Sequence, residues 1–271
     1  MSFIYAMSDI HGFYSEMSKR LDQLGNLQPM IDGKDKLIFL GDYIDGGTNS
    51  FKTIEMIFVW QEYYPENIIA LRGNHENMFI DFLDGKDNAW LGADVDFKTS
   101  KTFLNEEQFE KVKELVIEGN LRKAYSYIRE CIKKNHKDII NWMRKLPYFY
   151  ETDNQIFVHA GVDEEAEDWW KVGTPDYYFV GKYPATTGKF YKDIIAGHIA
   201  TASISGDPEF YDIYFDRQSH YYIDGTVEIS GSIPVLAYDE KKKKYYSLEE
   251  LVDRKRGRED RLKVCGKLRQ I

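Results

Sequence analysis

Three short apolar runs in the first part of the chain each end in a loop that carries acidic, histidine or asparagine residues. The runs are 3–7, 36–40 and 68–71, and they recur roughly every 30 residues, the length of a strand–helix–strand unit. Between them, segments 14–24 and 51–60 carry apolar residues at helical spacing. Strands that alternate with helices predict a parallel sheet. We therefore expect the three loops to meet at the carboxyl edge of that sheet, where open α/β sheets place their active sites.

The first two loops carry side chains that can bind divalent metal. Asp9 and His11 are two residues apart, so on an extended loop they can point to the same side and hold one ion. Asp42 directly follows its strand and could bridge two metals, and Asp45 could orient a histidine. Each aspartate also has a structural explanation, because aspartate is common in turns and helix caps.

The third loop has the sequence Arg72-Gly73-Asn74-His75-Glu76. Gly73 permits a tight turn, and Asn74 and His75 suggest one metal ligand beside one acid/base group. A surface turn with helix-capping residues is the alternative. Three loops of one kind at one edge of a sheet are difficult to attribute to turn chemistry, so we favour a shared site.

Two later apolar runs also end in histidine. The run 155–158 is followed by His159, and the run 194–196 is followed by Gly197 and His198. Singly, a core or capping histidine explains each of them equally well. As a pair that completes the earlier set, they indicate two further metal ligands. His220 precedes a predicted strand and is not counted among them.

Residues 77–147 interrupt the alternation of strands and helices. Helical signals cover 105–117, 121–135 and 138–146, which predicts a helical insertion beside the site. His136 lies there among lysines, and we expect it to be a solvated surface residue. Residues 249–271 mix charges of both signs and suggest a solvated helix or tail. The whole chain, 1–271, is interpreted as one domain.

Composition excludes several classes of protein. The chain has 271 residues, 43% of them hydrophobic, and a net charge of −9. The charge argues against a general nucleic-acid binder, which needs a basic footprint. Cys131 and Cys265 lie outside any Cys-x-x-Cys pattern, so a disulfide scaffold or a zinc–thiolate site is not expected. Without a transmembrane-length run or a signal core, we expect a soluble cytoplasmic protein whose oligomeric state the sequence leaves open.

Together these loops form a set of ordered motifs. The motifs are Ser-Asp-Ile-His-Gly (8–12), Gly-Asp-Tyr-Ile-Asp-Gly-Gly (41–47), Arg-Gly-Asn-His-Glu (72–76), Val-His-Ala-Gly (158–161) and Ala-Gly-His (196–198). The set resembles the signature blocks of the calcineurin-like metallophosphoesterases. It is most similar to the phosphoprotein phosphatase type, in particular its bacterial and phage serine/threonine phosphatase members. The resemblance implies a four-layer αββα sandwich with a dinuclear site between two sheets.

The resemblance also implies two divalent cations. Nitrogen and oxygen ligands suit Mn²⁺, with Fe or Zn²⁺ as alternatives, better than Ca²⁺. The implied ligands are Asp9, His11 and His198 for one ion, Asn74 and His159 for the other, and Asp42 as the bridge. Two such ions can share a water, lower its pKa and hold it in line with phosphorus.

The remaining roles concern the substrate. By the same resemblance, His75 would protonate the leaving oxygen, Asp45 would hold the imidazole ring and Arg72 would grip the phosphate. The chain departs from the family at Gly46, where members usually carry an arginine that helps to bind the phosphate. Lys182 and Lys189 precede the last ligand in sequence and are candidates to replace it.

The activity implied is that of a metal-dependent phosphomonoesterase acting on phosphorylated proteins or small phosphoesters. One alternative keeps the scaffold but cleaves a dinucleoside polyphosphate, a phosphodiester or a nucleic-acid end. A second alternative is a non-enzymatic binding protein on a degenerate phosphatase scaffold. Gly46 is compatible with both alternatives.

Overall fold

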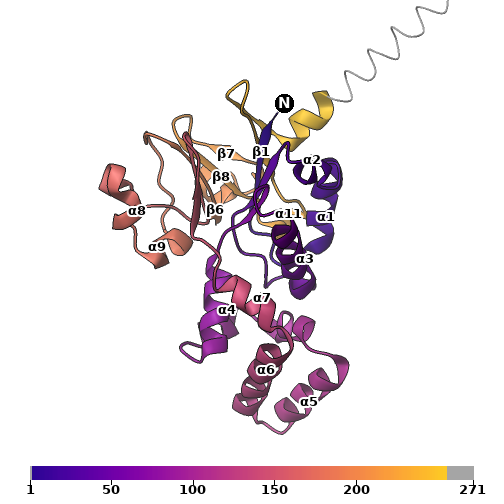
Figure 1. The fold of residues 1–271 in the computed structure, drawn as a ribbon. Helices are drawn as coiled ribbons and strands as arrows, with labels where there is room; N and C mark the ends of the chain where they lie inside the picture. The colour runs from indigo at the N-terminus through magenta and orange to yellow at the C-terminus, as the bar shows by residue number, and fades with distance from the viewer. Residues whose placement is uncertain (1, 255–271) are drawn as a thin grey trace, which may run out of the picture.

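Two five-stranded sheets form the centre of the computed structural model, which describes residues 2–254 (Figure 1). The first sheet has the strand order β10-β9-β1-β2-β3. Its members are β1 (Phe3–Met7), β2 (Lys36–Phe39), β3 (Ile68–Ala70), β9 (Leu236–Asp239) and β10 (Lys244–Ser247). Strands β1, β2 and β3 are mutually parallel, with Met7 opposite Phe39 and Phe39 opposite Ala70. This register makes the three polar loops begin at the same level of the sheet, as the sequence predicts.

The second sheet has the order β4-β5-β6-β8-β7. Its members are β4 (Phe149–Glu151), β5 (Gln155–Val158), β6 (Asp193–Ala200), β7 (Tyr214–Phe215) and β8 (His220–Asp224). The three central strands are parallel, and the two edge strands are antiparallel to their neighbours. His159 directly follows β5, and His198 lies within the last three residues of β6, which continues to Ala200 rather than ending at Ala196. Because β5 and β6 are parallel neighbours, the two rings lie close together, with centroids 5.2 Å apart.

Helices cover the outer faces of both sheets and complete the four layers (Figure 1). Beside the first sheet lie α1 (Tyr14–Gln23), α2 (Gln28–Ile31), α3 (Ser50–Tyr63) and α11 (Val227–Ser230), and beside the second lie α8 (Trp170–Gly173) and α9 (Asp176–Gly181). Strand β1 shows how the layers are held, because its alternating side chains enter two cores. Tyr5 and Met7 pack on the helical side, whereas Ile4 and Ala6 pack between the sheets with Phe157. The sandwich thus has buried apolar layers on both faces of its first sheet.

The segment between β3 and β4 is helical throughout its regular structure and extends from the sandwich (Figure 1). It contains α4 (Asn74–Asp84), three short 3₁₀ turns η1 (Ala89–Gly92), η2 (Val95–Phe97) and η3 (Ser100–Phe103), then α5 (Glu106–Ile117), α6 (Leu121–Asn135) and α7 (Lys137–Met143). Helix α5 begins with a capping box in which Asn105 accepts the Gln108 N–H at 2.8 Å. Two shorter elements, η4 (Glu164–Trp169) and α10 (Thr201–Ser205), lie in the second half of the chain.

The structure corrects some expectations. His136 is half-buried rather than solvated: its Nε2 lies 2.7 Å from the Phe103 carbonyl oxygen, and its ring centroid is 4.4 Å from that of Phe51. In the charged C-terminal stretch, residues 248–254 are helical, while 255–271, with Cys265, lie outside the described residues. Within residues 2–254, no helix combines the length and the apolar character needed to cross a bilayer.

Candidate metal centre

Loops from both sheets converge on the buried carboxylate of Asp42. Its Oδ2 lies 3.3 Å from Nε2 of His159, 3.8 Å from Nε2 of His11 and 3.8 Å from Nε2 of His75. These residues come from four segments that are far apart in the chain. The structure therefore brings together the side chains that the sequence motifs single out.

The possible ligand atoms fall into two sets that share Asp42. Those of His11, Asp42 and His75 lie within 4.8 Å of one another, and so do those of Asp42, His159 and His198. Asp9 and Asn74 adjoin these sets, because Asp9 Oδ1 is 4.0 Å from His11 Nε2 and Asn74 Oδ1 is 2.9 Å from His159 Nε2. A carboxylate common to both sets has the position that a bridge between two cations requires.

The chemistry of these donors fits divalent cations. Burial and the nearby His159 lower the pKa of His198 to about 4, which leaves a neutral imidazole of the kind that binds metal. Burial alone disfavours the charged form of Asp42, but His159 and His75 outweigh it and hold the pKa of Asp42 well below its usual range. Carboxylate, amide and imidazole donors together suit Mn²⁺, Fe or Zn²⁺.

The backbone of the site is held in an uncommon conformation. Positive φ angles are rare for residues other than glycine and cost about 1–3 kcal/mol each. Five site residues adopt them: Asp9 (53°), His11 (49°), Asp42 (55°), Asp45 (76°) and His198 (64°). Such strain gathers at functional sites, and here it lies at Asp42 and at residues of the loops around it.

His198 lies with a different set of possible ligands from the one that the resemblance implies. That assignment groups His198 with Asp9 and His11, whereas its ligand atom lies with those of Asp42 and His159. The reason is the pairing of β5 with β6, which places the Gly197 N–H 2.8 Å from the His159 carbonyl oxygen. The contact of His198 with Asp9 is made by its backbone N–H, at 3.0 Å.

His75 and Asp45 form a hydrogen-bonded pair next to Asp42. Nδ1 of His75 lies 2.6 Å from Asp45 Oδ2, and the buried Asp45 also accepts from Thr99 Oγ1 at 2.7 Å and Trp90 Nε1 at 3.1 Å. Burial disfavours the imidazolium, but the charge of Asp42 and the bond to Asp45 outweigh it and raise the pKa of His75 to about 10. Trp90 and Thr99 belong to the helical segment and were not identified from the sequence, since no local motif marks them.

Glu76 is a further residue of the site, and its role could not be predicted from the sequence motifs. Its fully buried carboxylate accepts the backbone N–H groups of Asp42 at 2.9 Å, Tyr43 at 2.8 Å and Gly73 at 3.0 Å. Glu76 therefore joins the second polar loop to the third. The available signal was its position in the first turn of α4, where an acidic residue can bond the N-cap backbone.

We expect Glu76→Ala to lower the free energy of unfolding by about 3 kcal/mol, because three buried N–H groups lose their acceptor. Urea denaturation of the purified variant measures the change. Glu62→Ala, at an exposed position of α3, is the matched control and should change stability little. Equal stability of the two variants would contradict the role of Glu76 as the link between the loops.

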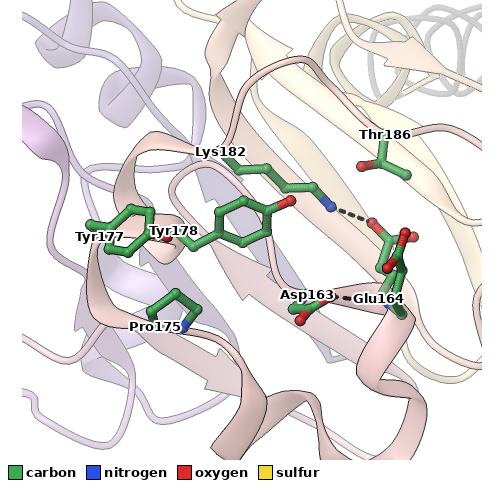
Figure 2. A pocket seen from close by; sticks show the side chains of 8 residues that line it. Asp163, Glu164, Pro175, Tyr177, Tyr178, Lys182 and Thr186 are labelled. Atoms are coloured by element: carbon green, nitrogen blue, oxygen red, sulfur yellow. Dashed lines mark hydrogen bonds and ion pairs between the residues drawn. The ribbon is translucent and has the colours of Figure 1, made fainter.

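The cations proposed for phosphate binding contact other groups. The guanidinium of Arg72 donates to the Met143 carbonyl at 3.1 Å and the Tyr148 hydroxyl at 3.3 Å. Lys182 is buried beside a pocket of about 440 Å³, where Nζ donates to Glu164 Oε1 at 2.7 Å and to the Val162 carbonyl at 2.8 Å (Figure 2). Neither contact set includes an expected metal ligand, so the phosphate role of Arg72 stays a prediction.

Comparison with known proteins identifies the family. The family model of the calcineurin-like phosphoesterases matches residues 4–225, and the chain belongs to this family. A segment of 73 residues, 27% of this chain, is 42% identical to the serine/threonine-protein phosphatase PP1-delta of Caenorhabditis elegans. The matched segment spans only 22% of the length of that relative.

Solved structures share the fold at low sequence identity. The cold-active protein-tyrosine phosphatase of a psychrophilic Shewanella species aligns with a TM-score of 0.57 and 14% identity, over 91% of this chain and 80% of that one. A further cold-active protein tyrosine phosphatase structure aligns with a TM-score of 0.56 and 13% identity, over 90% and 78%. These matches agree with the sandwich of two sheets flanked by helices.

Proposed function

We propose that this protein is a metal-dependent phosphomonoesterase that acts on phosphoserine or phosphothreonine in proteins. The observation that supports this most is the convergence of three histidines on Asp42, one of which, His75, is also paired with Asp45. Membership of the phosphoesterase family supports a phosphoester as the bond cleaved. The local identity to a serine/threonine phosphatase supports a phosphoprotein as the substrate.

Two divalent cations, Mn²⁺ in this proposal, would be held on either side of Asp42. Asp9 and His11 would hold one, and Asn74, His159 and His198 the other. When bound, such cations lower the pKa of a water and offset the charge of phosphoryl oxygens. The chain fixes the positions of the ligands through Glu76 and through the His198 N–H bond to Asp9.

His75 would be the proton donor to the leaving oxygen. Asp45 accepts a hydrogen bond from the Nδ1–H of His75, so the ring is fixed with Nε2 directed to the side of Asp42. A proton held at Nε2 can pass to an alkoxide, which is otherwise a poor leaving group. Asp45 acts as the positioning residue, since its own bonds to Thr99 and Trp90 hold it in place.

We expect Asp45→Asn to lower kcat on a phosphoserine peptide about 10²-fold, because the amide no longer holds the His75 imidazolium. KM and the bound metal should change little. Steady-state kinetics with metal analysis measure these effects, and Asp153→Asn, at an exposed loop position, is the control. A wild-type kcat in Asp45→Asn would show that His75 needs no such partner.

A second candidate is the hydrolysis of a phosphoanhydride or a phosphodiester. Gly46 favours it, because no side chain at that position can bind a terminal phosphate, and the charged groups of Arg72 and Lys182 contact other partners. Both candidates use the same metal ligands and differ in the group that the site must accept.

A substrate panel separates the two candidates. Purified, Mn²⁺-loaded protein is assayed with p-nitrophenyl phosphate, phosphoserine and phosphothreonine peptides, bis-p-nitrophenyl phosphate and diadenosine tetraphosphate, and its metal content is measured on the same sample. We expect the monoesters to be turned over fastest. Faster cleavage of the tetraphosphate or the diester would favour the second candidate, and a loaded sample that hydrolyses none of them would exclude both.

A further inference from the structure

Glu228 lies beside the metal centre although no motif contains it. Its Oε1 is 4.0 Å from Nε2 of His11, the same distance as Asp9 Oδ1 and close to the 3.8 Å of Asp42 Oδ2. Three carboxylates therefore approach one imidazole nitrogen at like distances. Two of them, Asp9 and Asp42, are expected ligands.

The fold directs Glu228 to this place. Strand β8 runs parallel to β6, with Asp224 paired to Ala200, so β8 ends at the edge that carries His198. A turn follows in which Asp224 Oδ1 accepts the Thr226 N–H at 2.8 Å, and α11 begins. Val227 is buried in the core and anchors this short helix, whereas the Glu228 side chain is 38% exposed. The backbone is thus anchored while the carboxylate faces both solvent and His11.

The absence of a side chain at residue 46 gives Glu228 its room. A Cβ at Gly46 would lie 3.1 Å from Glu228 Oε1 and 3.5 Å from the Cβ of His11. The first distance is tight and the second is an ordinary van der Waals contact, so a longer side chain at residue 46 would require the flexible end of Glu228 to move. A long side chain at residue 46 and the observed position of Glu228 therefore compete for one volume, which links Gly46 to Glu228.

The charge around His11 favours a cation. Within residues 2–254, no lysine or arginine forms an ion pair with Asp9, Asp42 or Glu228. Like charges that share a site repel one another unless a positive charge lies between them. Carboxylate oxygens are the ligands that hard divalent cations prefer.

We propose that Glu228 is a further ligand of the cation held by Asp9 and His11, in the space that Gly46 leaves open. This inference rests on the proposed metal-dependent function. It makes the two cation sites chemically unequal: the site at His11 is rich in carboxylate oxygen, whereas the site at His159 and His198 has two imidazoles. The first site would consequently select Mn²⁺ or Mg²⁺ more strongly than Zn²⁺.

Calorimetric titration of Mn²⁺ into the metal-free full-length protein tests the proposal without an activity readout. We expect the wild type to bind two ions, and Glu228→Gln to weaken one of them by at least about tenfold while the other keeps its affinity. Glu209→Gln removes the same charge from an exposed loop and should titrate as the wild type does. Thermal melting checks that each variant is folded.

Glu228→Asp separates ligation from a general effect of charge, because it keeps the charge but shortens the side chain. We expect it to weaken the same site. Wild-type affinity in Glu228→Asp, or unchanged binding of both ions in Glu228→Gln, would overturn the role of Glu228. In either case a wild type that binds two ions and hydrolyses the panel would leave the proposed function intact, whereas a wild type that binds no Mn²⁺ would remove both.

Discussion

Asp42→Ala is expected to lose most of its bound metal and at least about 10³-fold of kcat/KM on every phosphoester that the wild type cleaves. Asp42 is the only residue common to both sets of possible ligand atoms among the described residues, so both cation sites lose a donor at once. The variant also removes the acceptor of the His75 backbone N–H, which donates to Asp42 Oδ1 at 3.0 Å. Elemental analysis and kinetics on one purified sample measure the two effects.

Asp153→Ala, at an exposed position, is the control for the loss of one carboxylate and should keep both metal and activity. A thermal melt with chelator present shows whether Asp42→Ala folds independently of metal. A folded Asp42→Ala that retains two ions per chain would show that Asp42 does not bridge.

His75→Ala is expected to lower kcat about 10²–10⁴-fold on substrates with a poor leaving group, such as a phosphoserine peptide. The loss should be much smaller on p-nitrophenyl phosphate, whose leaving group departs without a proton. The structural basis is the 2.6 Å contact with Asp45, which fixes the ring with Nε2 toward the centre. The quantity to measure is the ratio of the wild-type kcat to the variant kcat, determined for each of the two substrates and then compared between them.

Metal analysis must accompany this comparison, because His75 Nε2 lies within reach of His11 and Asp42. If His75 were a ligand, His75→Ala would lose metal and would slow both substrates alike. Retained metal with an equal loss on both substrates would also argue against proton donation.

The strongly periodic parts of the fold could be predicted from sequence. Strands β1 and β5 and helix α6 have the predicted bounds, because each is a short apolar run or an amphipathic stretch between clear turn signals. The meeting of the first three polar loops also follows from sequence, since parallel strands in one sheet have their carboxyl ends at one edge.

The contacts that depend on tertiary packing could not be predicted. Trp90 and Thr99 reach Asp45 across more than 40 residues of chain, and nothing in their local sequence indicates it. His136 looked solvated among lysines, but α6 and α7 direct its ring onto Phe51. Helix α11 is too short to give a periodic signal, so Glu228 was not recognised either.

The most direct test of a dinuclear centre on Asp42 is a crystal structure of the protein grown with Mn²⁺, with the ions located by their anomalous scattering. We expect two peaks with the Asp42 carboxylate between them, one beside Asp9 and His11 and the other beside Asn74, His159 and His198. A single peak, or peaks away from Asp42, would contradict a centre that is built from loops of both sheets to hold two cations.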